Sequence, residues 1–76
     1  MESEKKTEAY LCSKVKLAGG MCIKLLAGSL TGLPDRLILL PGAVIFFVET
    51  KSEGDEPRKK QKFIHNKLRA LGFIVL

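Results

Sequence analysis

The stretch that decides the fold is GLPDRLILLPGAVIFFVETK, residues 32–51. Two predicted strands with apolar middles, 36–40 and 44–50, flank Pro41-Gly42, which suits a reversing turn between strands. Charged residues bracket the pair, with Asp35 and Arg36 at one end and Glu49 and Lys51 at the other. Either these charges form surface salt bridges, or the two strand ends meet at one charged site.

The length of the turn decides between these alternatives. A connection of three or four residues is expected, and if it is 41–43, Leu40 lies opposite Val44 and therefore Asp35 opposite Glu49. Lys51 then lies on the same face, whereas a shift of one residue would move Asp35 to the other face. Both faces of residues 44–48 are apolar, which predicts a central strand that is covered on both sides.

The rest of the chain supplies helices on either side of this hairpin. A helix over residues 4–18 ends at Gly19-Gly20 and is followed by a strand over 21–27. A second helix, 58–71, stops at Gly72 before a short strand, 73–76. A helix between the central and last strands favours a parallel crossover. The prediction is one α/β domain, residues 1–76, with the order α-β-β-β-α-β and a mixed sheet.

Each predicted helix carries one polar residue on its apolar face. Glu8 shares helical spacing with Leu11 and Val15, and Gln61 shares it with Ile64. A carboxylate that faces the core is unfavourable unless it is paired. Glu8 therefore either joins a polar site or reaches solvent from the first turns of the helix.

Composition narrows the class of protein. The 76 residues carry a net charge of +5, from thirteen basic and eight acidic residues, which favours a polyanionic partner such as nucleic acid. A chain of this length is marginally stable alone, so we expect a homodimer.

No secretory signal, membrane span or organic-cofactor motif is evident, and we expect an intracellular, cytoplasmic protein. Cys12 and Cys22 lack a metal-site or scaffold spacing and are predicted to be packed thiols.

The predicted charged site suits metal chemistry. Asp35 and Glu49 on adjacent strands repel each other unless a cation lies between them. Oxygen ligands are those that Mg²⁺ or Mn²⁺ prefers, and Lys51 beside such a metal can hold a water and stabilise developing charge. The residue set therefore suits metal-assisted hydrolysis of a phosphodiester.

Each of these features also has a simpler interpretation. Glu49 and Lys51 can form a surface pair worth under ~1 kcal/mol, and Pro-Asp is a common turn dipeptide. His65 is interpreted as a helix-surface or partly packed residue. The run 58–62 is either a solvated helix face or a set of phosphate contacts. The combination of motifs is more specific than any one of them.

In order along the chain, the motifs are Glu8, Gly19-Gly20 followed by Lys24, GLPDR at 32–36, FVETK at 47–51, Gln61, and LRALG at 68–72. This pattern resembles the VRR-NUC family within the PD-(D/E)xK nucleases. The resemblance covers almost the whole chain and implies a restriction-endonuclease-like core, with a mixed central sheet flanked by helices. Thr50 departs from it, because the middle residue of E-x-K is usually aliphatic, although only its carbonyl is needed.

The resemblance also implies roles for individual residues. Asp35, Glu49 and the Thr50 carbonyl would bind Mg²⁺ or Mn²⁺, and Glu8 would complete the metal shell or bind a second ion. Lys51 would position the nucleophilic water, and Gln61 would orient Lys51 or that water. Two further positions, Lys24 and Arg36, match the family, with either phosphate contact or support of the site as their role.

The function implied is a divalent-metal endonuclease that cleaves branched DNA, such as four-way (Holliday) junctions, as a homodimer of phage or bacterial type. A nuclease acting on flaps or other DNA structures is the nearest alternative. A non-catalytic basic module that binds nucleic acid is the alternative from a different class.

Overall fold

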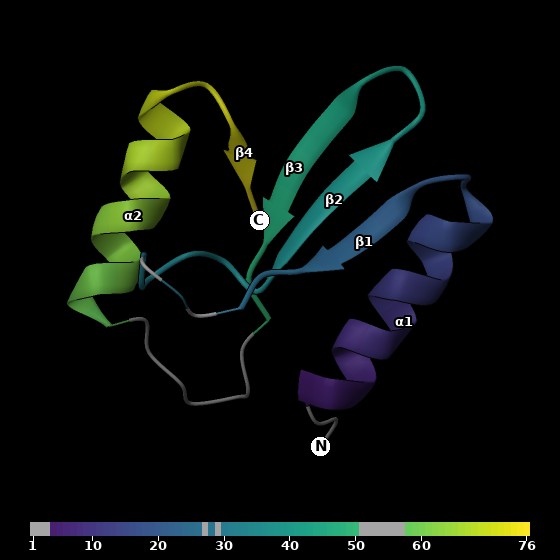
Figure 1. The fold of residues 1–76 in the computed structure, drawn as a ribbon, viewed down its shortest axis with the longest axis horizontal. Helices are drawn as coiled ribbons and strands as arrows, with labels where there is room; N and C mark the ends of the chain where they lie inside the picture. The colour runs from purple at the N-terminus through teal and green to yellow at the C-terminus, as the bar shows by residue number, and fades with distance from the viewer. Residues whose placement is uncertain (1–3, 27, 29, 51–57) are drawn as a thin grey trace.

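The computed structural model describes residues 4–26, 28, 30–50 and 58–76 (Figure 1). The elements are α1 (Glu4–Leu17), β1 (Met21–Lys24), β2 (Arg36–Leu40), β3 (Val44–Val48), α2 (Lys59–Ala70) and β4 (Ile74–Val75). The predicted element order is confirmed. The strands β1, β3 and β4 are shorter than expected, since they end at Lys24, Val48 and Val75.

The described strands form a four-stranded sheet in the order β1-β2-β3-β4. The pairs β1–β2 and β2–β3 are antiparallel, whereas β3–β4 is parallel. The parallel pair follows from α2, which carries the chain from the end of β3 back to the start of β4. The mixed sheet is therefore the predicted one.

The β2–β3 hairpin has the predicted register. Leu40 pairs with Val44, and Arg36 pairs with Val48, so Asp35 and Glu49 are the residues that come next at the open end of this ladder. Two consecutive residues of the 41–43 turn have positive φ, Gly42 at 86° and Ala43 at 61°. A three-residue connection of this kind matches the twist of paired strands.

The prediction that β3 is covered on both faces is wrong for its first half. Val44 and Ile45 are 46% and 43% exposed. The helices lie elsewhere, because α1 packs against β1 and α2 against β4, on the two sides of the hairpin in Figure 1. The strand is central by its pairing, but no described helix packs against it at the turn.

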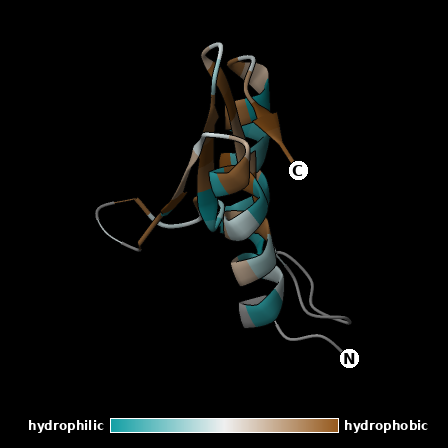
Figure 2. Ribbon diagram, turned by 90° about the vertical axis from the view of Figure 1, so that its right-hand side faces the viewer, coloured by the Kyte–Doolittle hydropathy of each residue, from teal (hydrophilic) through white to brown (hydrophobic). Residues whose placement is uncertain are grey.

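The core joins residues from both helices and the sheet. Val15 of α1, Ile38 of β2, Ile64 of α2 and Val75 of β4 are buried, and Ile38 is fully enclosed. In Figure 2 the strands are mostly hydrophobic, whereas hydrophilic and hydrophobic residues alternate along the helices. None of the described helices is long and apolar enough to cross a membrane.

The structure corrects the prediction of packed thiols, because a disulfide joins Cys12 of α1 to Cys22 of β1. Their Cα atoms are 5.3 Å apart, within the usual range for such a bond. The Gly19-Gly20 turn folds β1 back along α1, so the ten-residue spacing brings the two cysteines together. Gly20 is required for this turn, since a Cβ there would overlap the Leu39 carbonyl oxygen of β2.

Candidate functional site

Asp35 immediately precedes β2 and is held by the residue that follows Glu49. The Thr50 backbone N–H and hydroxyl both donate to Asp35 Oδ2, at 2.9 and 2.8 Å. The Asp35 carbonyl accepts from the Leu25 N–H at 2.9 Å, which continues the β1–β2 ladder. Among the described residues, the second carboxylate oxygen, Oδ1, has no hydrogen-bond partner.

The loop before Asp35 is seated on α2 through a glycine. Gly32 has φ of +93°, and a Cβ there would lie 2.8 Å from the Lys60 carbonyl oxygen and 3.0 Å from Ile64 Cγ1. Pro34 is fully buried. Only glycine allows this backbone to approach α2 so closely, and the Gly-Leu-Pro-Asp sequence thereby fixes the position of Asp35.

Glu49 lies one residue beyond β3, and backbone bonds to β4 hold it there. Its N–H donates to the Leu76 carbonyl at 3.0 Å, and the Leu76 N–H donates to the Phe47 carbonyl at 2.9 Å. The Glu49 side chain is only 9% exposed, and its Oε1 lies 3.6 Å from Nε2 of His65. His65 is itself buried in α2, so of its two interpretations the surface one is wrong and the packed one agrees with the structure.

Glu8 faces inward, as the first of the two sequence interpretations requires. Its Oε1 lies 3.4 Å from Nε of Arg36, and both side chains are 16% exposed. This ion pair compensates for the partial burial of the carboxylate. Lys24 is opposite Arg36 in the β1–β2 ladder and is exposed. Two like charges on directly opposed residues repel, so Glu8 also offsets that repulsion.

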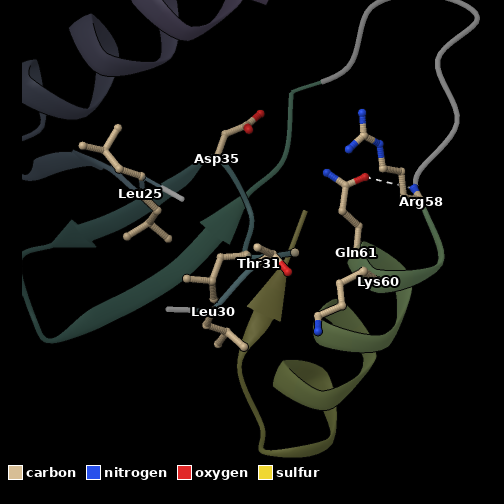
Figure 3. Close-up of a pocket in the computed structure, with 10 residues that line it drawn as sticks. Leu25, Leu30, Thr31, Asp35, Arg58, Lys60 and Gln61 are labelled. Carbon is tan, nitrogen blue, oxygen red and sulfur yellow. Dashed lines mark hydrogen bonds between the residues drawn. The ribbon is translucent and has the colours of Figure 1, made fainter. Parts of the chain in front are cut away.

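Gln61 lies in the first turn of α2. Its Oε1 accepts the Arg58 N–H at 3.0 Å, which satisfies one of the unpaired donors at the helix start. In Figure 3, Gln61 and Asp35 line the same cleft, from α2 and from the start of β2. The cleft has a volume of about 530 Å³. Its lining residues are Leu25, Leu26, Leu30, Thr31, Gly32, Leu33, Asp35, Arg58, Lys60 and Gln61.

The structure thus brings together part of the predicted site. Asp35 contacts Thr50, Gln61 shares a cleft with Asp35, and Glu8 pairs with Arg36. Lys51 lies outside the described residues. Within residues 4–26, 28, 30–50 and 58–76, no three His, Cys, Asp or Glu side chains form a group that could hold a metal ion.

The donor atoms of the site nevertheless suit a hard divalent cation. Asp35 retains one oxygen without a partner in the described chain, and Glu49 adds a second carboxylate from the neighbouring strand. The Thr50 carbonyl would add a third oxygen. A donor set made only of oxygens suits Mg²⁺ or Mn²⁺ and not a thiolate-preferring metal.

Two residues were missed by the sequence reasoning. The Thr50 hydroxyl holds Asp35, although only the Thr50 carbonyl was expected to matter. His65 contacts Glu49. A weak signal existed for His65, because it follows Gln61 by four residues and so shares its helix face.

The chain is similar in sequence and in fold to known proteins. No protein-family model matches the chain. The chain is 40% identical over 73 residues to a protein named "Putative nuclease p44" of Acyrthosiphon pisum secondary endosymbiont phage 1, covering 96% of this chain and 78% of that protein. A solved structure described as "VRR_NUC domain" superposes with a TM-score of 0.85 at 34% identity, over 95% of this chain and 78% of the other. Sequence and fold agree that this chain belongs to the VRR-NUC nuclease family.

Proposed function

We propose that the chain is a DNA endonuclease that requires Mg²⁺ or Mn²⁺ and hydrolyses phosphodiester bonds. The observation that carries this proposal is the register of β2 and β3, which brings Asp35 and Glu49 to the same end of adjacent strands. The nuclease family and the oxygen-only donor set support it.

The residues would divide the work as follows. Asp35, Glu49 and the Thr50 carbonyl would hold the cation, which when bound supplies Lewis-acid stabilisation of the phosphate. Lys51 would hold the attacking water and offset charge on the phosphoryl oxygens. Gln61 would orient Lys51 or the water from the wall of the cleft that it shares with Asp35. Glu8, through Arg36, would support the start of β2 or bind a second ion.

DNA is the proposed substrate because the site adjoins basic groups. Arg58 and Lys60 line the cleft beside Asp35 and are exposed, so they can contact phosphates on either side of the bond that is cut. Such contacts give affinity without reading base sequence. We expect Lys24 to contribute to the same phosphate path, since it is exposed at the end of β1.

A homodimer that cuts branched DNA is the finer form of the proposal. Four exposed apolar residues at the turn end of β3 and around the start of β4, here called the β3–β4 apolar patch, would offer contacts on both faces of this end of the sheet to a second copy, since successive residues of a strand point to opposite faces. They are Val44, Ile45, Phe73 and Ile74. A two-fold dimer would present two identical sites, which matches paired cuts in a symmetric four-way junction. We place this activity in the cytoplasm of a bacterium or of a phage-infected cell.

Cleavage assays test the proposal directly. The protein is incubated with labelled four-way junction, flap and linear duplex DNA, with Mg²⁺, Mn²⁺ or a chelator. We expect metal-dependent cuts, fastest in the junction, that disappear with Lys51→Ala. Absence of cleavage, or cleavage that Lys51→Ala leaves unchanged, would reject the proposed endonuclease function. Preference for the flap would keep the nuclease and reject the junction.

A non-catalytic nucleic-acid-binding module is the second candidate. The Glu8–Arg36 pair favours it to the extent that one of the predicted metal ligands already serves as an ion-pair partner. Titration with Mn²⁺ separates the two functions. Saturable binding that Asp35→Asn removes supports the enzyme, whereas DNA binding without any metal binding supports the module.

A further inference from the structure

The contact between His65 and Glu49 is the feature that the proposed chemistry does not yet use. Both side chains are 9% exposed, and Nε2 of His65 lies 3.6 Å from Oε1 of Glu49. The two residues come from different elements, His65 from the middle of α2 and Glu49 from the end of β3. Packing of α2 against the sheet therefore sets their separation.

A buried carboxylate needs a nearby donor, and Nε2 of His65 lies beside Glu49 Oε1 without forming a hydrogen bond to it in this structure. Burying an ionised carboxylate without compensation is strongly unfavourable. The separation of 3.6 Å lies within ion-pair reach and is slightly longer than a hydrogen bond. Catalytic contacts of this kind are often long in the unliganded protein and shorten in the working complex. When Nε2 carries a proton, it can donate to Glu49 Oε1 once the two atoms come within hydrogen-bond distance.

The neighbouring carboxylate, Asp35, is held by shorter contacts that are full hydrogen bonds. Asp35 has one oxygen held by Thr50, which leaves the other directed elsewhere. Glu49 has one oxygen facing His65. Groups that hold a ligating carboxylate from behind fix its orientation, and their loss typically weakens metal binding 10- to 100-fold.

We propose that His65 is a positioning residue, which orients the Glu49 carboxylate so that its other oxygen can bind the divalent cation. The proposal rests on the metal-dependent function proposed above. One face of α2 would then carry two residues that support the site, since Gln61 lies one turn before His65. His65 acts through Glu49 and does not itself bind the metal.

The test compares three substitutions at one position. His65→Gln keeps an N–H donor at nearly the reach of Nε2, His65→Asn shortens that reach, and His65→Leu removes the donor. Lys67→Ala, an exposed change in the same helix, is the matched control. Mn²⁺ affinity is measured by calorimetry without DNA, and folding is followed by thermal melting.

We expect His65→Leu and His65→Asn to weaken Mn²⁺ binding about 10- to 100-fold, with His65→Gln and Lys67→Ala close to the parent protein. In a Glu49→Gln background, His65→Leu should have no further effect. Unchanged affinity in His65→Leu would overturn the proposal, as would equal loss in the Gln and Leu variants. If His65→Leu does not fold, the Gln and Asn variants carry the same comparison.

Two further results keep the alternatives apart. Pulsed electron paramagnetic resonance of bound Mn²⁺ should show no coupling to a histidine nitrogen, and such coupling would replace positioning by direct ligation. Parent protein that binds no Mn²⁺ would reject the metal-dependent function and this role with it. Parent protein that binds Mn²⁺ while the His65 variants remain unchanged would reject only the role of His65.

Discussion

The two ends of the β2–β3 hairpin are built in opposite ways. At the open end, Asp35, Glu49 and Thr50 are partly or fully buried and are joined to each other or to α2 by polar contacts. At the turn end, Val44 and Ile45 are apolar and exposed. The polar residues are enclosed and the apolar residues are uncovered, which is the reverse of what burial alone would select.

This reversal separates residues whose burial does not favour folding from apolar residues left open for a partner. The enclosed carboxylates are unfavourable for folding and are kept in place by specific partners, as is typical of functional sites. The uncovered apolar end lies in the β3–β4 apolar patch and suits a protein partner. Changes at the open end should therefore alter activity, and changes at the turn end should alter association.

The largest effect is expected from Asp35→Asn. The amide oxygen can still accept from Thr50, so the fold should persist, whereas the charge proposed to bind the metal is lost. Cleavage should fall by more than the ~100-fold expected for loss of an outer partner. Cleavage rates with Mg²⁺ measure the effect, and circular dichroism monitors the fold. Near-parental cleavage would remove Asp35 from the site.

Gly32→Ala should have the largest effect on stability. The new Cβ would meet the Lys60 carbonyl oxygen at 2.8 Å, in a backbone conformation that alanine disfavours. We expect a loss of about 1–3 kcal/mol in the free energy of unfolding from the backbone strain alone. Urea denaturation measures it, with Gly28→Ala as the control because nothing lies within 4 Å of its Cβ position. Equal effects of the two changes would contradict close packing of this loop on α2.

Thr50→Val should have an intermediate effect. It removes the hydroxyl donor at 2.8 Å and keeps both the side-chain shape and the backbone donor to Asp35. We expect a loss of about 1 kcal/mol in stability and weaker Mn²⁺ binding, since Asp35 becomes less well oriented. Thr50→Ser, which retains a hydroxyl, should recover most of the affinity. Unchanged binding in Thr50→Val would assign the hydroxyl to stability alone.

The smallest effect on the monomer is expected from Ile45→Lys at the turn end. Ile45 is exposed, so the free energy of unfolding should change by no more than about 0.5 kcal/mol. A charge in the β3–β4 apolar patch should nevertheless weaken self-association. Sedimentation over a range of concentrations tests this. A monomeric parent protein, or a variant dimer as tight as the parent, would exclude this patch as the interface.

Local patterns made much of this architecture predictable. The turn length and the period-two alternation set the hairpin register, and so the pairing that brings Asp35 and Glu49 to one end. The glycines at 19, 20 and 72 marked the helix ends for the same local reason.

Contacts between distant elements were not predictable in this way. The contact of His65 with Glu49 depends on how α2 packs beside β3, and the Cys12–Cys22 bond depends on the path of the turn between α1 and β1. The exposure of Val44 and Ile45 depends on where the helices end relative to the sheet. None of these three features follows from a repeating pattern in the sequence.

The bonds between Thr50 and Asp35 have a mechanical consequence for the proposed metal site. Asp35 accepts hydrogen bonds from both the N–H and the hydroxyl of Thr50, which ties the start of β2 to the end of β3. A displacement of Asp35 would therefore also move the Thr50 carbonyl that is proposed as a ligand. Substitutions at positions 35 and 50 should accordingly be non-additive, with the double variant little worse than the poorer single one.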